Sequence, residues 1–135
     1  MKRYVLDASA LMAFFEKEPG ADREEGLLRE AAGTERRLLM SVVNWGEVYY
    51  VVWRKYGEAA ARQKLEEMAR LPLEVVDVDM ETTLLAASLK AKHKLPYADC
   101  FAAALAQQQK ASLVTVDRDF AQLERELAVV WVARG

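Results

Sequence analysis

Short apolar runs alternate with helical patterns along the whole chain, and this alternation limits the folds that are open to it. The strand formers and short lengths of five runs are typical of buried strands. These runs are residues 3–7, Leu38–Met40, Leu73–Val76, Leu113–Val116 and Val129–Val132. Strands that alternate with helices build a parallel sheet with right-handed crossovers. We therefore expect an α/β fold with a central, mostly parallel sheet of about five strands and helices on both faces.

Capping residues, glycines and prolines set the expected bounds of the helices in the first half of the chain. Ser9 can cap a first helix, which the pair Pro19–Gly20 would end. Three more helices are expected before the third strand. They cover residues 21–32, 42–56 and 58–70, and Gly33, Gly57 and Pro72 follow them. Ser41 is the expected cap of the long helix 42–56. The last two helices would form a hairpin beside the sheet.

The second half of the chain predicts three further helices. Asp79 can cap a helix that runs to about Lys92, Pro96 suits the first turn of a helix that runs to about Lys110, and Asp117 can cap a short helix that ends near Glu126. In the first of these helices we expect the core face to be Leu84, Leu85 and Leu89.

Composition excludes several classes of protein. With 135 residues and 53% hydrophobic content, we expect one domain over residues 1–135. The formal net charge of −2 rules out a broadly basic nucleic-acid binder, so any contact with RNA must come from local groups. The single Cys100 leaves no internal disulfide. Apolar runs are too short to span a bilayer and no signal peptide is evident, so we expect a cytoplasmic protein.

Three of four acidic residues lie at junctions between strands and helices, where ligands bind in open α/β sheets, and the fourth lies on a buried helix. Asp7 and Asp117 each follow a strand directly. Asp99 lies in the first turn of a helix whose small residues would let it press close to the sheet. Glu47 lies on the long helix, among valines, tryptophans and tyrosines. We expect all four side chains to converge on one edge of the sheet.

Each acid also has an ordinary structural explanation. Asp7 and Asp117 can be helix caps, and an acid in the first turn, such as Asp99, complements the helix dipole. Glu47 can pair with Arg54, two turns along the same helix, because a buried unpaired charge is costly. Taken one at a time, these residues leave both explanations open.

The joint placement of the acids favours a metal site. Four like charges at one edge would repel, and some would be forced to bind protons. A hard divalent cation relieves this repulsion, and an all-carboxylate ligand set suits Mg²⁺ or Mn²⁺ rather than zinc. Such a site can hydrolyse a phosphodiester. The basic residues Lys90, Lys92 and Lys94, with His93, can hold phosphates or simply complement the end of a helix.

Four motifs resemble those of the PIN-domain ribonucleases, in particular the VapC-type toxins of toxin–antitoxin pairs. They are YVLDASA, SVVNWGEVYYV, LPYADCFAAALA and LVTVDRDF, in that order. The resemblance covers essentially the whole chain and implies a three-layer PIN-like fold. It also implies that Asp7, Glu47, Asp99 and Asp117 are the acidic quartet. Asp7 and Asp99 would be the most direct metal ligands.

The resemblance further implies the activity and the partners. It implies an endoribonuclease that depends on Mg²⁺ or Mn²⁺ and cuts RNA, a homodimer, and a small VapB-type antitoxin that blocks the site. Ser9 and Thr115 stand where the family often has supporting hydroxyls, and Asp119 is a less certain fifth acid.

Alternatives from two other classes are a phosphatase or phosphoreceiver, which the residues disfavour, and a binding module. A phosphatase of the haloacid type needs a second acid two residues after the acid at the end of the first strand, and Ser9 stands there instead. A phosphoreceiver needs paired acids near the first strand, which the chain lacks. A non-catalytic binding module that keeps the acids for folding is the remaining alternative.

Overall fold

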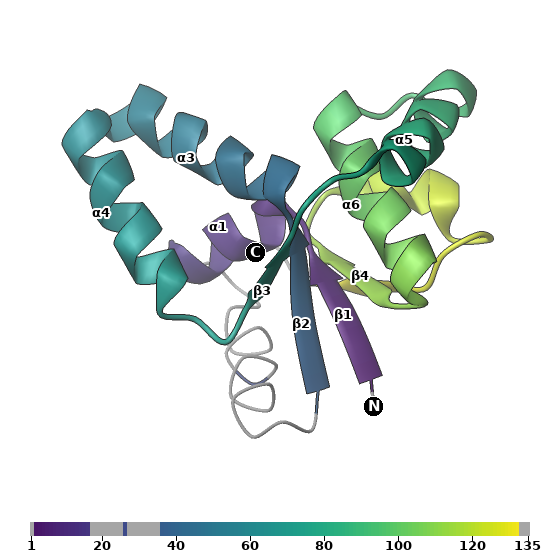
Figure 1. The fold of residues 1–135 in the computed structure, drawn as a ribbon, viewed down its shortest axis with the longest axis horizontal. Coiled ribbons are helices and arrows are strands. Elements are labelled where there is room, and N and C mark those ends of the chain that lie inside the picture. The colour runs from purple at the N-terminus through teal and green to yellow at the C-terminus, as the bar shows by residue number, and fades with distance from the viewer. Residues whose placement is uncertain (1, 17–25, 27–35, 133–135) are drawn as a thin grey trace.

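The computed structural model describes residues 2–16, 26 and 36–132, and its layers are shown in Figure 1. The helix expected over residues 21–32, with Gly33 behind it, and the stop at Pro19–Gly20 therefore lie outside the described residues, apart from Gly26, which is helical. Among the described helices, none combines the length and the apolar character that a membrane crossing needs.

The centre of the fold is a parallel sheet of five strands. The strands are β1 (Lys2–Leu6), β2 (Arg36–Ser41), β3 (Glu74–Val76), β4 (Ser112–Thr115) and β5 (Val129–Trp131). Their order is β3-β2-β1-β4-β5, and every neighbouring pair is parallel. All five strands were predicted from the apolar runs. Because β1 lies in the middle, the residue that follows it lies in the middle of one edge of the sheet.

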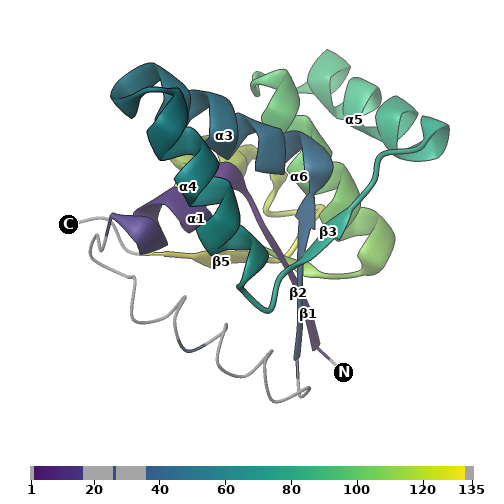
Figure 2. The same ribbon diagram turned by 60° about the vertical axis from the view of Figure 1, so that its left-hand side comes forward.

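Helices cover both faces of the sheet, as predicted (Figures 1 and 2). They are α1 (Ala8–Phe15), α3 (Val42–Tyr56), α4 (Glu58–Ala69), α5 (Met80–Lys92), α6 (Tyr97–Gln109) and the 3-10 helix η1 (Arg118–Leu123). One core lies between the sheet and α5, α6 and η1. The other lies between the sheet and α1, α3 and α4. The fold therefore has three layers.

Small side chains bring α6 close to the sheet. Ala102, Ala103, Ala104 and Ala106 are all buried, and α6 contacts β1, β2 and β4. A helix lined with alanine can approach a sheet more closely than one lined with leucine, because its surface has no large side chains to hold the backbones apart. This close approach carries the first turn of α6 towards the edge of the sheet.

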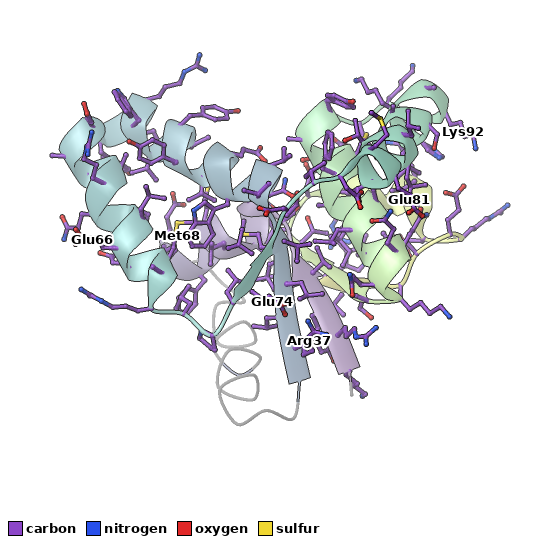
Figure 3. The ribbon with its side chains drawn as sticks, in the orientation of Figure 1. Arg37, Glu66, Met68, Glu74, Glu81 and Lys92 are labelled. Carbon is purple, nitrogen blue, oxygen red and sulfur yellow. The ribbon has the colours of Figure 1, made fainter. Side chains whose placement is uncertain are left out.

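The α3–α4 hairpin was predicted and stands beside the sheet (Figure 1). Ser41 caps α3 by accepting a hydrogen bond from the Val43 N–H at 3.2 Å, and Gly57 ends the helix with a φ of 94°. That φ is unfavourable for any residue with a Cβ atom. Figure 3 shows the amphipathic character of α4: Met68 is buried in the core, whereas Glu66 is exposed.

The structure settles two local predictions. Of the two expected caps of α1, Asp7 and Ser9, the cap is Asp7, because the Asp7 Oδ1 accepts the Ala10 N–H at 2.8 Å; the prediction of Ser9 was wrong. Leu84 is 62% exposed, so it does not belong to the core face of α5. The buried face is formed by Thr82, Ala86 and Leu89, of which Leu89 was predicted. They are spaced four and three residues apart, as one side of a helix requires.

The tight packing of α6 predicts the response to overpacking. Ala103→Leu should lower the free energy of unfolding by about 1–3 kcal/mol, because the added carbons have no space around the fully buried Ala103. Leu84→Ala, on the exposed side of α5, should change it by less than about 0.5 kcal/mol. Urea unfolding followed by circular dichroism measures both. Equal losses in the two variants would contradict the packing described here.

Candidate active site

The four predicted acids come from four different elements that meet at one edge of the sheet. Asp7 follows β1 and Asp117 lies two residues after the end of β4, which is the parallel neighbour of β1. Asp99 lies in the first turn of α6, and Glu47 lies in the second turn of α3. The starts of α1, α3 and α6 lie near one another above the carboxyl ends of the central strands (Figure 1).

Asp7 is held by three hydrogen bonds in an almost fully buried position. Its side chain is 2% exposed. Oδ1 accepts bonds from the Ser9 hydroxyl and from the Ala10 N–H, both at 2.8 Å, and Oδ2 accepts a bond from the Thr115 hydroxyl at 2.6 Å. Asp7 therefore caps a helix and also lies beside the other acids, so the two explanations for it do not exclude each other.

The hydroxyls of Ser9 and Thr115 connect Asp7 to the neighbouring strand. Thr115 Oγ1 donates to Asp7 and accepts the Asp117 N–H at 2.9 Å. Ser9 Oγ donates to Asp7 and accepts the Val116 N–H at 3.3 Å. The end of β1 and the end of β4 are thus joined by two hydroxyls, which fixes the relative positions of Asp7 and Asp117.

Burial is the main cause of the altered acidity of Asp7. It raises the pKa of this carboxyl from 3.8 to about 6, although the hydrogen bonds from Thr115, Ala10 and Ser9 act in the opposite direction. The negative charge of Asp117 adds a smaller upward contribution to the pKa.

Asp99 has the most perturbed environment of the four acids. Its side chain is 8% exposed, and its buried Oδ2 has no hydrogen-bond partner in the described part of the chain. The pKa of Asp99 is raised from 3.8 to about 8; burial is the largest cause, and the negative charges of Asp7, Asp117 and Glu47 contribute to the same rise. All three other acids therefore act electrostatically on Asp99, which requires them to lie near it.

Glu47 is partly buried, and burial is the largest cause of its raised pKa. Asn44 Nδ2 donates a hydrogen bond to Glu47 Oε1 at 3.2 Å, which favours the charged form, whereas the charge of Asp117 disfavours it. Arg54 is not its partner, since the Arg54 guanidinium lies 5.6 Å from the centroid of the Tyr50 ring and no ion pair joins it to Glu47 among the described residues. The alternative of a Glu47–Arg54 pair was wrong.

Asp117 caps η1, as predicted, by accepting the Asp119 N–H at 2.9 Å. This short helix is of the 3-10 type and ends at Leu123 rather than near Glu126. Asp119 itself is exposed, and its charge is not among the causes of the shifted pKa values of Asp7, Glu47 and Asp99. Asp119 therefore differs from the four converging acids.

The carboxylates are neighbours but do not form a closed ligand set. Over residues 2–16, 26 and 36–132, no three His, Cys, Asp or Glu side chains are close enough to share one ion as they stand. Both Asp7 oxygens already accept hydrogen bonds, and repulsion separates like charges when no cation lies between them. Joint coordination would therefore need side-chain rotation. The donor type fits a hard cation, as does the unpaired Oδ2 of Asp99.

Other residues considered from the sequence have structural roles. Lys90 Nζ donates to the Leu95 carbonyl at 2.7 Å and so ties the end of α5 to the loop before α6. His93 Nε2 lies 3.7 Å from Glu126 Oε1. Cys100 is a buried free thiol whose pKa is raised by burial. Asn44 was not predicted as a site residue; the signal for it in the sequence is a polar side chain one helical turn before Glu47 in an otherwise apolar stretch.

Comparison with known proteins identifies the fold family. The sequence profile of the PIN domain matches residues 4–126. The chain belongs to the PIN domain family. This confirms the resemblance expected from the four motifs. The four acids lie within the matched region of this PIN domain.

Curated relatives and solved structures agree with this assignment. A VapC ribonuclease of Mycobacterium bovis and ribonuclease VapC30 of Mycobacterium tuberculosis are each 29% identical over 123 residues, covering 86% of this chain and 91% of theirs. The structure of VapBC2 from Rickettsia felis bound to a promoter DNA fragment has a TM-score of 0.76 at 18% identity, covering 97% of this PIN domain and 99% of that chain. DNA-bound VapBC from Salmonella typhimurium has a TM-score of 0.74 at 18% identity, covering 98% of this chain and 100% of that chain.

The raised pKa values predict how stability depends on pH when divalent cations are removed. In the unfolded chain Asp7 and Asp99 titrate near 3.8, whereas in the folded chain they titrate near 6 and 8. Between about pH 4 and pH 8 the folded chain therefore binds more protons than the unfolded chain. Its free energy of unfolding should fall as the pH rises through this range. Asp99→Asn should remove most of this fall and raise the melting temperature at pH 8 by about 4 °C or more.

Thermal unfolding in EDTA, at several pH values from 5 to 8, measures this effect. A melting temperature that is independent of pH in the unaltered protein, or that has the same pH dependence in Asp99→Asn, would contradict the mutual destabilisation of the acids.

Proposed function

We propose that this PIN domain is a divalent-metal-dependent endoribonuclease and the toxin of a VapBC-type toxin–antitoxin pair. The observation that carries the proposal is the electrostatic convergence of Asp7, Glu47 and Asp117 on the buried Asp99. Perturbed acids that cluster at the carboxyl edge of a parallel sheet are typical of a catalytic site. The names of the curated relatives, which are VapC ribonucleases, support the same activity.

Asp7, Glu47, Asp99 and Asp117 are the residues that would hold Mg²⁺ or Mn²⁺. Their donor atoms are all carboxylate oxygens, which these ions prefer. When bound, the ion supplies charge compensation for the acids and for the phosphate, and it promotes the ionisation of water. Without the ion, the negatively charged phosphate backbone of RNA would be repelled by the four carboxylates.

Neighbouring residues of the chain would orient the acids and restrict the rotation of their side chains. Ser9 and Thr115 fix Asp7 through Oδ1 and Oδ2, so this carboxylate presents a constant direction to the substrate. Asp99, with an unpaired Oδ2, provides the free acceptor. In the reaction, water attacks the phosphorus opposite the 3′ oxygen and the P–O3′ bond breaks. The 3′ oxygen leaves with a proton, which gives 5′-phosphate and 3′-hydroxyl ends.

Space and charge beside the acids support an RNA substrate. A cavity of about 390 Å³ is lined by Ser9, Val116, Asp117, Arg118 and Val132. This volume falls within the range of small-ligand sites and leaves room for a nucleotide next to the acids. The guanidinium of Arg118, which lines this cavity, lies 4.7 Å from the centroid of the Trp131 ring. Arginine planes and aromatic rings are the groups on which single-stranded RNA bases stack.

The partners follow from the same family. We propose a VapB-type antitoxin as the regulator and a homodimer as the working form, within the cytoplasm and with a single nuclease domain over residues 1–135. Support comes from the solved relatives, which are VapBC complexes, and from exposed aromatic residues on α3, namely Tyr50, Trp53 and Tyr56. Exposed apolar groups of this size are typical of protein–protein interfaces.

Asp99→Asn is the substitution that tests the activity. It keeps the shape of the side chain but removes the charge, so RNA cleavage should fall by at least about 100-fold while the fold is retained. The matched control is Asp79→Asn, because asparagine caps helices about as well as aspartate and Asp79 caps α5 away from the acids. Cleavage of a mixed RNA substrate in Mg²⁺ or Mn²⁺, with sequencing of the fragment ends, measures the difference.

The result also separates an enzyme from a non-catalytic binding module. A well-folded Asp99→Asn protein that cleaves like the unaltered one, or fragments that carry 2′,3′-cyclic phosphates, would contradict the proposed reaction. A binding module would show no cleavage in either protein and no rise in melting temperature with millimolar Mn²⁺.

A further inference from the structure

Asn44 is a buried polar residue on α3 that takes no direct part in the proposed reaction. Its side chain is 0% exposed. Nδ2 donates to Glu47 Oε1, one turn along α3, at 3.2 Å, and to the carbonyl oxygen of Ala98 at 3.1 Å. Ala98 lies in the first turn of α6 and directly precedes Asp99. One amide group therefore connects the acid on α3 to the segment that carries the acid on α6.

Chemistry fixes the orientation of this amide. A carboxylate and a carbonyl can only accept hydrogen bonds, so the nitrogen of Asn44 must face both of them. The other amide atom, Oδ1, is then left buried, without a donor among the residues that the structure describes. An unpaired buried acceptor costs free energy, and asparagine is a poor residue for a helix interior.

The position of Asn44 is therefore unfavourable for folding alone. Leucine has nearly the same size, forms helices better and has no polar atom to satisfy. The first turn of α6 does not need the amide either, because the Ala98 carbonyl lies within that helix, where the N–H four residues later can bond it. A polar residue that costs stability in a buried position is typical of a functional site.

We propose that Asn44 is a positioning residue for the cation site: its Nδ2 holds the Glu47 carboxylate towards Asp99 and sets the spacing between α3 and α6. This inference rests on the proposed function, because it assumes that the four acids bind a divalent cation together. Asn44 supplies the one hydrogen bond to the Glu47 side chain found in the described part of the chain. Without it, the half-buried Glu47 is free to turn towards solvent.

Asn44→Leu separates positioning from a structural role. The substitution should weaken Mn²⁺ binding by about 10-fold or more, as the loss of a residue that orients a metal ligand does. The melting temperature in EDTA should stay the same or rise, because the unpaired Oδ1 is removed. Isothermal titration with Mn²⁺ and thermal unfolding measure the two effects on the same protein. A purely structural residue would lower the melting temperature instead.

A double-mutant cycle tests whether Asn44 acts through Glu47. In a Glu47→Gln protein, Asn44→Leu should change the Mn²⁺ affinity by less than about two-fold, because the group that Asn44 positions is already altered. Thr82→Val is the matched control: Thr82 is buried and its hydroxyl lies 2.7 Å from Gln108 on α6, but it does not contact the four acids. Its Mn²⁺ affinity should equal that of the unaltered protein.

The outcomes distinguish this inference from the proposed function. Equal Mn²⁺ affinity in Asn44→Leu and the unaltered protein would overturn the role of Asn44 but not the metal site. The same holds if Asn44→Leu lowers the Mn²⁺ affinity equally in the unaltered and the Glu47→Gln backgrounds. A loss as large in Thr82→Val would also overturn it, since any loosening of α6 would then suffice. Absence of Mn²⁺ binding by the unaltered protein would overturn the metal site and, with it, this role. Asn44→Ala, carried in parallel, must weaken binding in the same way if Asn44→Leu folds poorly.

Discussion

Repulsion among four carboxyl groups at one edge of a parallel sheet is the constraint on which this structure depends. Burial and the neighbouring charges raise the pKa of Asp99 to about 8, and burial raises that of Asp7 to about 6. Such groups destabilise the folded chain whenever they are charged, so they do not serve its stability at neutral pH. In the proposed function, a divalent cation would turn the same arrangement from a cost into a binding site, because it would replace repulsion among the acids with attraction to a shared ion.

Several features of the fold act to keep these acids together. The central place of β1 and its pairing with β4 bring Asp7 and Asp117 to neighbouring strand ends. Two hydroxyls then join those ends. The alanine-rich face of α6 brings Asp99 in from the other layer, and the α3–α6 junction adds Glu47. The position of each acid therefore depends on contacts made by residues far from it in the sequence. The cores on both faces of the sheet together hold the four acids at one edge.

Much of this arrangement could be predicted from the sequence because it follows from local patterns. The five apolar runs became the five strands, and Ser41, Asp79 and Asp117 became helix caps, since capping depends on groups within a few residues. Asp7 and Ser9 were both possible caps of α1, because each has a suitable side chain near its start. The structure decides for Asp7, whose Oδ1 accepts the Ala10 N–H, and its Oδ2 also accepts a bond from Thr115, 108 residues away.

Features that depend on contacts between distant elements could not be predicted in this way. Apolar character suggested Leu84 for the core, but the side of α5 that faces α6 is set by packing, and that side carries Thr82 and Ala86. Asn44 was not predicted to belong to the site, because its second partner, Ala98, lies 54 residues further along the chain. The rotamers of the acids are set by hydrogen bonds and repulsion, so the sequence predicted their convergence but not the open arrangement of their oxygens.

The most direct test of the central claim is anomalous diffraction from a crystal of the protein soaked in Mn²⁺. The account predicts one or two anomalous peaks among the four acids, with oxygens of Asp7 and Asp99 at roughly 2.1 Å from an ion and with side chains rotated from their metal-free positions. An ordered site without an anomalous peak at saturating Mn²⁺, or a peak that contacts only one of the four acids, would contradict it.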